Sequence, residues 1–286
     1  MRRWLIGVPA LWLVAFFAMP FLLILRVSLS QAVLGQPPFT PLFGEDGFQG
    51  GLANFTLLLE DELYLDAILA SLALAASSTA ACILLGYPMA WAIAGAPRAW
   101  RAPLLALVAL PFVTSFLIRV YAWIGLLRPT GFLSVLLQSL GLIDQPLALV
   151  PSSFAVALGM TYTYLPFMVL PIYASLEKID PTLTAAAADL GARPARIFWS
   201  VTLPLSLPGV LAGSLFVFVP AVGEFVVPEL LGGPGTPMIG KVIWQEFFNN
   251  RDWPLASALA VVLLVLLALP IALAQRSQAP TAQGLR

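Results

Sequence analysis

Three charged residues lie inside apolar stretches of the sequence, where charge is costly: Glu224, Glu229 and Arg119. A charged side chain surrounded by hydrocarbon needs a partner or a cavity, so each of them is a candidate functional residue. Glu224 is the most deeply placed acid, and it stands beside Pro220 and Gly223, which can interrupt a helix and leave carbonyl groups free to line a cavity. Its carboxylate could attract a passing cation or pair with Arg119, and the sequence leaves both partners open.

Carboxylates and aromatic rings gather in one further place, between Trp244 and Trp253, and aromatic rings without a carboxylate stand beside Arg119. Carboxylates pair with ammonium groups, and aromatic rings cover methylene groups and attract cations. An alkyl chain with two ammonium ends could use both kinds of contact. The alternative is a belt of aromatic rings at the membrane surface with solvated acids. The candidates are Tyr121 and Trp123 beside Arg119, and further along the chain Trp244, Gln245, Glu246, Asp252 and Trp253.

This chain has few of the residues that enzymes use for catalysis. It contains no histidine and one cysteine, Cys82, which removes Ser-His and Cys-His nucleophile systems and the usual zinc ligands. The run 235–241 satisfies most of a phosphate-loop pattern, but Val242 stands where Mg²⁺ needs a Ser or Thr hydroxyl. We therefore expect no catalysis, no metal site and no cofactor in this chain. The rival classes are a membrane-embedded enzyme, which lacks a catalytic cluster here, and a scaffold, which leaves the intramembrane carboxylates unexplained.

Membrane-spanning helices must position these residues. The 286 residues are 60% hydrophobic and 10% charged, which is too little polar surface to cover a soluble protein of this size. The 14 basic and 14 acidic residues cancel, so no net field points to nucleic acid. A span needs about 20 apolar residues. Six segments qualify and predict an all-α polytopic protein with one transmembrane domain over 1–286: 5–29, 67–94, 103–127, 152–176, 206–230 and 255–275.

The charges between the spans predict an orientation, because Arg and Lys accumulate on the side that is not translocated. The basic side carries Arg2, Arg3, Arg98, Arg101, Lys178, Arg193, Arg196, Arg276 and Arg286. The acidic side carries Glu45, Asp46, Glu60, Asp61, Glu62, Asp66, Asp144, Glu246 and Asp252, with Arg128, Lys241 and Arg251 as its clear basic residues. We therefore expect both termini and the 177–205 loop to face the cytoplasm.

The 177–205 loop contains the start and stop signals of two short helices. Asp180 can cap a helix that begins at Pro181, and Gly191 can supply the left-handed turn that ends it. A second helix can begin at Pro194 and would carry Arg196. These signals predict a helix-turn-helix elbow outside the membrane. The alternative is an ordinary loop whose two amphipathic turns lie on the lipid surface.

A resemblance favours the elbow. Ala186-Ala187, Gly191-Ala192, Phe198, Leu203-Pro204-Leu205 and Pro208-Gly209 resemble the "EAA" loop of binding-protein-dependent ABC importer permeases. In that family the loop is a coupling helix that docks into a cleft of the cytoplasmic ATPase. The family has Glu where this sequence has Ala185, so we expect no salt bridge there. The residues to which the resemblance assigns ATPase coupling are Ala186, Ala187, Asp189, Gly191, Ala192, Arg193, Arg196 and Phe198.

Further segments are similar to the permease subunits of bacterial polyamine importers, most of all the putrescine type: 111–127, 143–147, 162–176, 218–234 and 239–254. The resemblance implies a type I ABC importer permease fold and a place in the bacterial inner membrane. It also implies a second homologous permease subunit, a dimer of cytoplasmic ATPases that binds ATP and Mg²⁺, and a periplasmic solute-binding protein. Import of putrescine or spermidine by alternating access is the expected function. The alternative is an importer of another small solute, such as an amino acid, sulfate or ferric ion.

Overall fold

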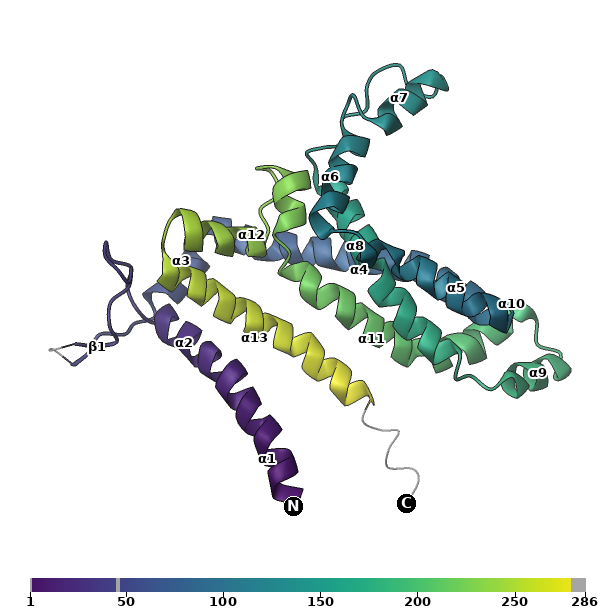
Figure 1. Cartoon of the computed structure of the whole chain (residues 1–286), viewed down its shortest axis with the longest axis horizontal. Helices are drawn as coiled ribbons and strands as arrows, with labels where there is room; N and C mark the ends of the chain where they lie inside the picture. Colours follow the sequence, from purple (N-terminus) through teal and green to yellow (C-terminus); the bar gives the residue numbers. More distant parts are fainter. Residues whose placement is uncertain (1, 45–46, 279–286) are drawn as a thin grey trace. The chain divides into compact units, whose positions relative to one another are not determined.

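The computed structural model describes residues 2–44 and 47–278, and this part of the chain is mostly helical (Figure 1). Within it, six helical segments are long and apolar enough to cross a membrane, which confirms the predicted all-α, six-span class. They are Gly7–Ser28, Glu62–Gly95, Phe116–Ser139, Ser153–Leu176, Pro194–Val222 and Trp253–Ala272. The chain divides into two compact units. Two of the three boundaries fall within the helices Glu62–Gly95 and Trp253–Ala272, and the third falls in the loop between Thr236 and Pro237. Glu45, Asp46 and Arg286 of the predicted charge asymmetry lie outside the described residues.

The first unit comprises the described residues of Met1–Leu69 and Pro237–Leu269. Its elements are α1 (Arg2–Leu13), the π-helical turn η1 (Val14–Ala18), α2 (Met19–Ser28), β1 (Phe43–Gly44), β2 (Gly47–Phe48), α3 (Ala53–Glu60), the start of α4 (Glu62–Gly95), α12 (Ile239–Trp244), the π-helical turn η5 (Gln245–Asn249) and most of α13 (Trp253–Gln278). The strands pair antiparallel, with Phe43 opposite Phe48. The Asn54 side chain donates hydrogen bonds to the carbonyls of Ser28 and Ser30, both 2.8 Å long, and so ties α3 to the end of α2.

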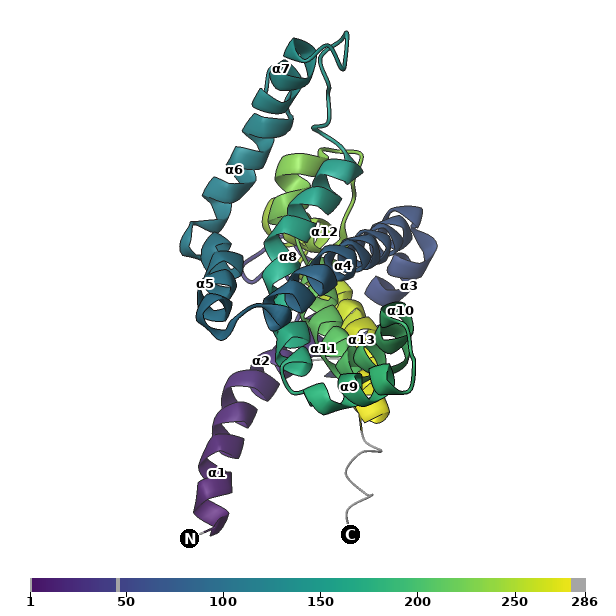
Figure 2. The same cartoon turned by 90° about the vertical axis from the view of Figure 1, so that its right-hand side faces the viewer.

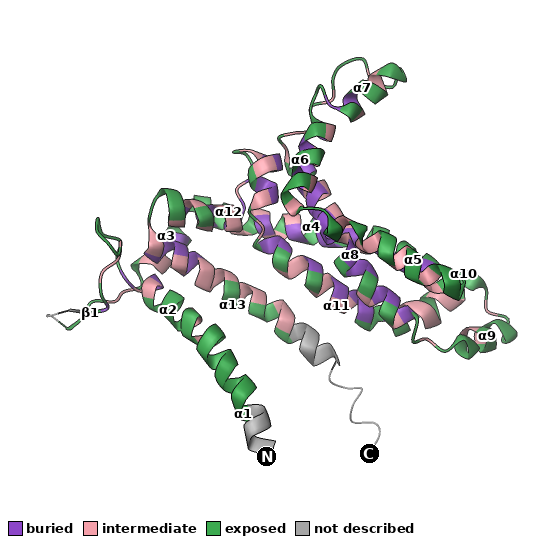
Figure 3. Ribbon diagram, viewed as in Figure 1, coloured by how far each residue is buried: buried purple, intermediate pink, exposed green. Residues whose placement is uncertain are grey.

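The span Gly7–Ser28 has almost no protein neighbours. Its sequence is strongly apolar, and its side chains are exposed along nearly all of α2 and the described part of α1 (Figure 3). An apolar helix that is exposed on all sides is stable only in lipid or against another chain. The exposure of this apolar segment is therefore the clearest structural sign that the protein lies in a membrane.

The second unit comprises Ala70–Thr236 together with the described residues from Pro270 onward. Besides the rest of α4 and the end of α13, its elements are α5 (Arg98–Ala109), the 3₁₀ turn η2 (Leu110–Val113), α6 (Phe116–Leu127), α7 (Phe132–Ser139), α8 (Ser153–Leu176), α9 (Pro181–Asp189), α10 (Pro194–Ile197), the π-helical turn η3 (Phe198–Thr202), α11 (Leu203–Val222) and the π-helical turn η4 (Pro228–Gly232). Helices α6 and α8 can be followed in Figure 2.

The core of the second unit is the contact between α8 and α11. Two glycines of α11 permit this close approach: a Cβ at Gly209 would lie 2.5 Å from the Pro171 carbonyl oxygen, and one at Gly213 would lie 2.8 Å from Met168 Sδ. Small residues serve the same purpose wherever membrane helices pack closely, because lipid offers no hydrophobic drive between helices. Because α8 and α11 pack closely, the middle of α8 lies near the residues that follow the C-terminal end of α11.

The third span differs from the prediction. Residues 103–127 were expected to form one helix, but α5 ends at Ala109 and α6 begins at Phe116, with η2 and an extended Thr114 between them. Pro111 explains the break, because it has no N–H to donate and its ring clashes with the carbonyl four residues earlier. The segment of span length is instead Phe116–Ser139.

The fifth span also differs. It was expected over 206–230, yet one helical segment runs from Pro194 through η3 and α11 to Val222. The second arm of the predicted elbow is therefore continuous with the span. A wide π turn at Phe198–Thr202 accommodates Pro204, whose ring would clash with the carbonyl of Ser200 in a regular α-helix.

Two other boundaries were placed wrongly. The second span begins at Glu62 instead of residue 67, because the Asp61 carboxylate accepts the Leu63 N–H (2.9 Å) and caps the helix there. The segment 231–254 was expected to be a loop, but it contains α12 and η5.

Candidate functional site

Glu224 lies in a short non-helical break between α11 and the helical segment that leads into η4. Its Oε2 accepts a hydrogen bond from the Tyr164 hydroxyl (2.6 Å), and its Oε1 accepts the N–H groups of Phe225 (3.1 Å) and Val226 (3.0 Å). The carboxylate thus caps the next helical segment, which confirms that the chain breaks its helix at this acid. All three of these donors are neutral, so they hold the carboxylate without cancelling its charge.

A series of aromatic rings continues from Tyr164. Its ring centre lies 6.3 Å from that of Phe167, which lies 5.0 Å from that of Phe112. The Arg119 guanidinium carbon lies 5.8 Å from the Phe112 centre and 5.7 Å from the Phe116 centre. The series therefore has a carboxylate at one end and a guanidinium between two rings at the other.

Arg119 is not the partner of Glu224. The Glu224 oxygens are bonded as described above, and the Arg119 Nε and Nη1 atoms are buried without a hydrogen-bond partner in the described part of the chain. The sequence left two partners open for Glu224, a passing cation and Arg119. The structure shows no ion pair between the described residues Glu224 and Arg119. The Tyr164 hydroxyl, which the sequence analysis did not single out, bonds the carboxylate instead. A tyrosine in an apolar span needs a partner for its hydroxyl, and this signal pointed to Tyr164.

The remaining candidates of the second unit are less enclosed. Trp123 packs edge-on against Tyr162, with ring centres 5.4 Å apart. Tyr121 is 59% exposed, and Glu229 is exposed in η4. The structure therefore brings Arg119 into one ring series with the partner of Glu224, but it does not bring Tyr121 into that series.

Within the first unit, Glu246 is held inside the fold. Its side chain is buried, Oε1 accepts the Tyr64 hydroxyl (3.1 Å) and Oε2 accepts the Asn250 side-chain amide (2.8 Å). Asp252 accepts the Leu255 N–H (2.9 Å) and caps α13. Both carboxylates thus organise the segment between η5 and α13.

The aromatic rings of the same region pack on one another. Trp253 stacks face to face on Phe247, with centres 4.9 Å apart and planes 6° apart, and its centre lies 6.2 Å from that of Phe39. Trp244 packs against Phe248 at 5.4 Å and is 39% exposed. Trp244 is therefore only partly covered in the described part of the chain.

The predicted elbow is present. The Asp180 carboxylate accepts the Thr182 N–H (2.9 Å) and caps α9, which begins at Pro181. Gly191 has φ +79°, the left-handed conformation that glycine adopts without strain, and α10 begins at Pro194. The helix-turn-helix form is thereby confirmed.

The tip of the elbow is open, and its base is anchored. Asp189, Gly191, Arg193 and Arg196 are exposed, as is Ala186, whereas Ala187 and Ala192 are half-buried. Leu190, which sequence reasoning overlooked, is 90% exposed at the end of α9. The tip of the elbow therefore leaves both charged and apolar side chains uncovered by the rest of the described chain.

Phe198 anchors the base of the elbow to α4. Its ring meets that of Tyr87 edge-on at 5.6 Å and lies 5.9 Å from that of Trp91. The Tyr87 hydroxyl also lies 2.8 Å from the Ser206 hydroxyl of α11. Phe198 therefore joins the elbow to the spans.

Comparison with known proteins shows which protein family has this sequence and fold. The family described as "Binding-protein-dependent transport system inner membrane component" matches residues 4–282. The spermidine/putrescine transport system permease protein PotB of Escherichia coli is 41% identical over 261 residues, which cover 90% of each chain. PotB of Haemophilus influenzae is 39% identical, covering 91% of this chain and 88% of its own.

Solved structures show the same fold. A chain of a bacterial alginate ABC transporter, in complex with an alginate pentasaccharide-bound periplasmic protein, superposes with a TM-score of 0.72 at 20% identity, over 96% of this chain and 94% of its own. Since the family match spans nearly the whole sequence and relatives near 40% identity cover about 90% of it, this chain belongs to the binding-protein-dependent transport system inner membrane components and is a permease subunit of an ABC importer with six membrane-spanning helices.

Proposed function

We propose that this permease carries a polyamine, putrescine or spermidine, across the bacterial inner membrane. The relatives near 40% identity are named for spermidine and putrescine transport. The structural observation that carries the proposal is the Glu224 carboxylate, which stands at a helix break and is held by three neutral donors. A passing ammonium group would supply the positive charge that this site lacks.

The rings beside Glu224 suit the rest of a polyamine. Its methylene groups need apolar cover, and its ammonium groups are attracted by aromatic faces. Tyr164, Phe167 and Phe112 form such a surface in continuous contact. Arg119 closes the series with a positive charge, which would repel ammonium groups and confine them to the Glu224 end.

Movement would reach this site through one continuous helical element. The helical segment from Pro194 to Val222 joins the elbow directly to the break that holds Glu224. At about 1.5 Å per residue, its part α11 alone is about 30 Å long. A shift of the elbow would therefore be transmitted to the Glu224 break, which is what alternating access requires.

The complete transporter supplies what this chain lacks. We assign ATP and Mg²⁺ binding to a dimer of cytoplasmic ATPases that docks on the 177–205 elbow through its open tip. A second homologous permease would provide the other half of the pathway, and a periplasmic binding protein would deliver the solute. Both termini lie on the cytoplasmic side in this proposal, and this chain itself carries no cofactor.

Uptake of labelled putrescine and spermidine tests the proposal in a strain that carries the whole transporter. Unlabelled polyamines should compete with the label, and amino acids, sulfate and ferric ion should not. Uptake that polyamines leave unchanged and that one of the other solutes inhibits would replace the polyamine with that solute.

A further inference from the structure

A cavity of about 490 Å³ lies between the cytoplasm-facing ends of α4 and α8 in the proposed orientation, at the base of the elbow. Trp91, Arg98 and Arg101 line one side of it, and Glu177 and Pro181 line another. Nothing in the transport cycle described above uses this cavity.

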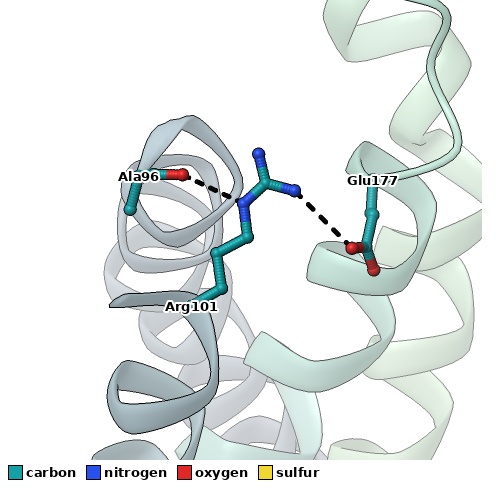
Figure 4. Close-up of polar contacts among 3 residues, drawn as sticks. All are labelled: Ala96, Arg101 and Glu177. Carbon is teal, nitrogen blue, oxygen red and sulfur yellow. Dashed lines mark hydrogen bonds and ion pairs between the residues drawn. The ribbon is translucent and has the colours of Figure 1, made fainter. Parts of the chain in front are cut away.

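The walls of the cavity carry one uncompensated positive charge. Arg101 donates to the Ala96 carbonyl (3.0 Å), and its Nη1 lies 3.6 Å from Glu177 Oε1 (Figure 4). The lining holds two arginines and this one carboxylate. Arg98 is exposed and forms no ion pair with a residue that the structure describes, so its charge is available to a ligand.

The cavity also lies at the level where the chain leaves the membrane. The spans that border it end at Gly95 and Leu176. Trp91 is 55% exposed, and Trp100 and Trp199, which belong to the adjoining helical turns, are 62% and 68% exposed. Exposed tryptophans mark the depth of lipid headgroups, and basic cavities between spans on the cytoplasmic side suit anionic headgroups.

We propose that this cavity binds the headgroup phosphate of an anionic phospholipid, with Arg98 as its principal contact and Trp91 against the lipid. A soluble phosphate ester would gain the same charge contact but not the lipid-facing ring. The combination of a free arginine and a tryptophan at the ends of two spans therefore favours a membrane lipid.

Lipid binding would also affect the elbow. Pro181 and Thr184 of α9 line the same cavity, so a bound headgroup contacts the helix that carries the open tip. Occupancy would fix α9 against α4 and α5 and so favour ATPase docking. This second step rests on the proposed coupling role of the elbow, whereas the binding step does not.

Binding is measured with fluorescent phosphatidylglycerol and the purified transporter complex in detergent. Arg98→Gln should weaken binding about fivefold, the effect of one arginine near an anionic lipid. Arg98→Lys should retain most of it. Arg128→Gln removes an equal charge from an exposed site outside the cavity and should leave binding unchanged.

Two outcomes would overturn the lipid site: equal weakening by Arg98→Gln and Arg128→Gln, which indicates diffuse surface charge, or competition by glycerol 3-phosphate as strong as that of the lipid, which indicates a soluble ligand. The link to the elbow is read from ATP hydrolysis by the complex in phosphatidylcholine vesicles with and without phosphatidylglycerol. Stimulation by phosphatidylglycerol that Arg98→Gln abolishes supports the link, and hydrolysis indifferent to the lipid overturns it. Neither readout depends on which solute is carried.

Discussion

The Tyr164 hydroxyl lies 2.6 Å from Glu224 Oε2, although 60 positions separate the two residues in the sequence. The contact joins the middle of α8 to the break after α11, and it gives a carboxylate in a membrane span a neutral donor instead of a fixed cation. This arrangement leaves the negative charge free to act on a solute.

Tyr164→Phe should therefore reduce polyamine uptake without preventing assembly. A hydrogen bond to a charged group contributes about 1.5 to 3 kcal/mol, so uptake at low substrate concentration should fall by roughly tenfold or more. Tyr162→Phe is the matched control, because that ring packs on Trp123 and its hydroxyl does not contact Glu224. Equal losses in both variants would show that the Tyr164 hydroxyl has no special role.

Gly191→Pro should uncouple the permease from its ATPase. Proline fixes φ near −65°, whereas Gly191 has φ +79°, so the turn between α9 and α10 cannot form. We expect normal membrane insertion, loss of ATPase co-purification and loss of uptake. Gly141→Pro places the same strain at another glycine of positive φ, outside the elbow, and should leave the ATPase bound. A Gly191→Pro complex that retains the ATPase and transports normally would contradict the coupling role.

The orientation can be tested with thiol labelling in a Cys82→Ala background. Ala195→Cys and Gln49→Cys both place a thiol at an exposed position. We expect an impermeant reagent to label position 49 in cells with a permeable outer barrier, and position 195 only after the cells are opened. Labelling of position 195 from outside would reverse the orientation and remove the elbow from the ATPase.

The α9 cap should depend on pH. The hydrogen bond from the Thr182 N–H holds the pKa of the Asp180 carboxyl below its usual value. The cap therefore contributes fully above the ordinary pKa of aspartate and is lost as the pH falls through the lowered pKa. Hydrogen exchange of the α9 amides should accelerate in that acid range relative to the intrinsic rate, and Asp180→Asn should remove this dependence. Protection that changes equally with pH in both proteins would contradict it.

Local signals were sufficient for much of the fold. Composition and span length predicted the six helices, because a lipid-exposed helix needs no particular partner. The elbow was also predictable, since Asp180, Pro181 and Gly191 act on their own neighbours in the chain.

Long-range contacts were not predictable in this way. The Tyr164 and Glu224 pair depends on how closely α8 approaches α11, which Gly209 and Gly213 determine only once the two helices are known to pack. The break after Ala109 had a local cause in Pro111, but hydropathy alone does not distinguish one long span from two shorter helices.

The central claim is that the Glu224 carboxylate acts on a cationic solute. Its most direct test is uptake of labelled putrescine and spermidine by Glu224→Gln, at concentrations well below saturation, together with the yield of the solubilised complex. Glu60→Gln, an exposed acid of α3, serves as the control for loss of one charge. We predict that Glu224→Gln assembles normally and loses roughly tenfold to a hundredfold of its uptake, for about 1 to 3 kcal/mol of lost interaction, while Glu60→Gln transports normally. Normal uptake by Glu224→Gln under these conditions would contradict the account.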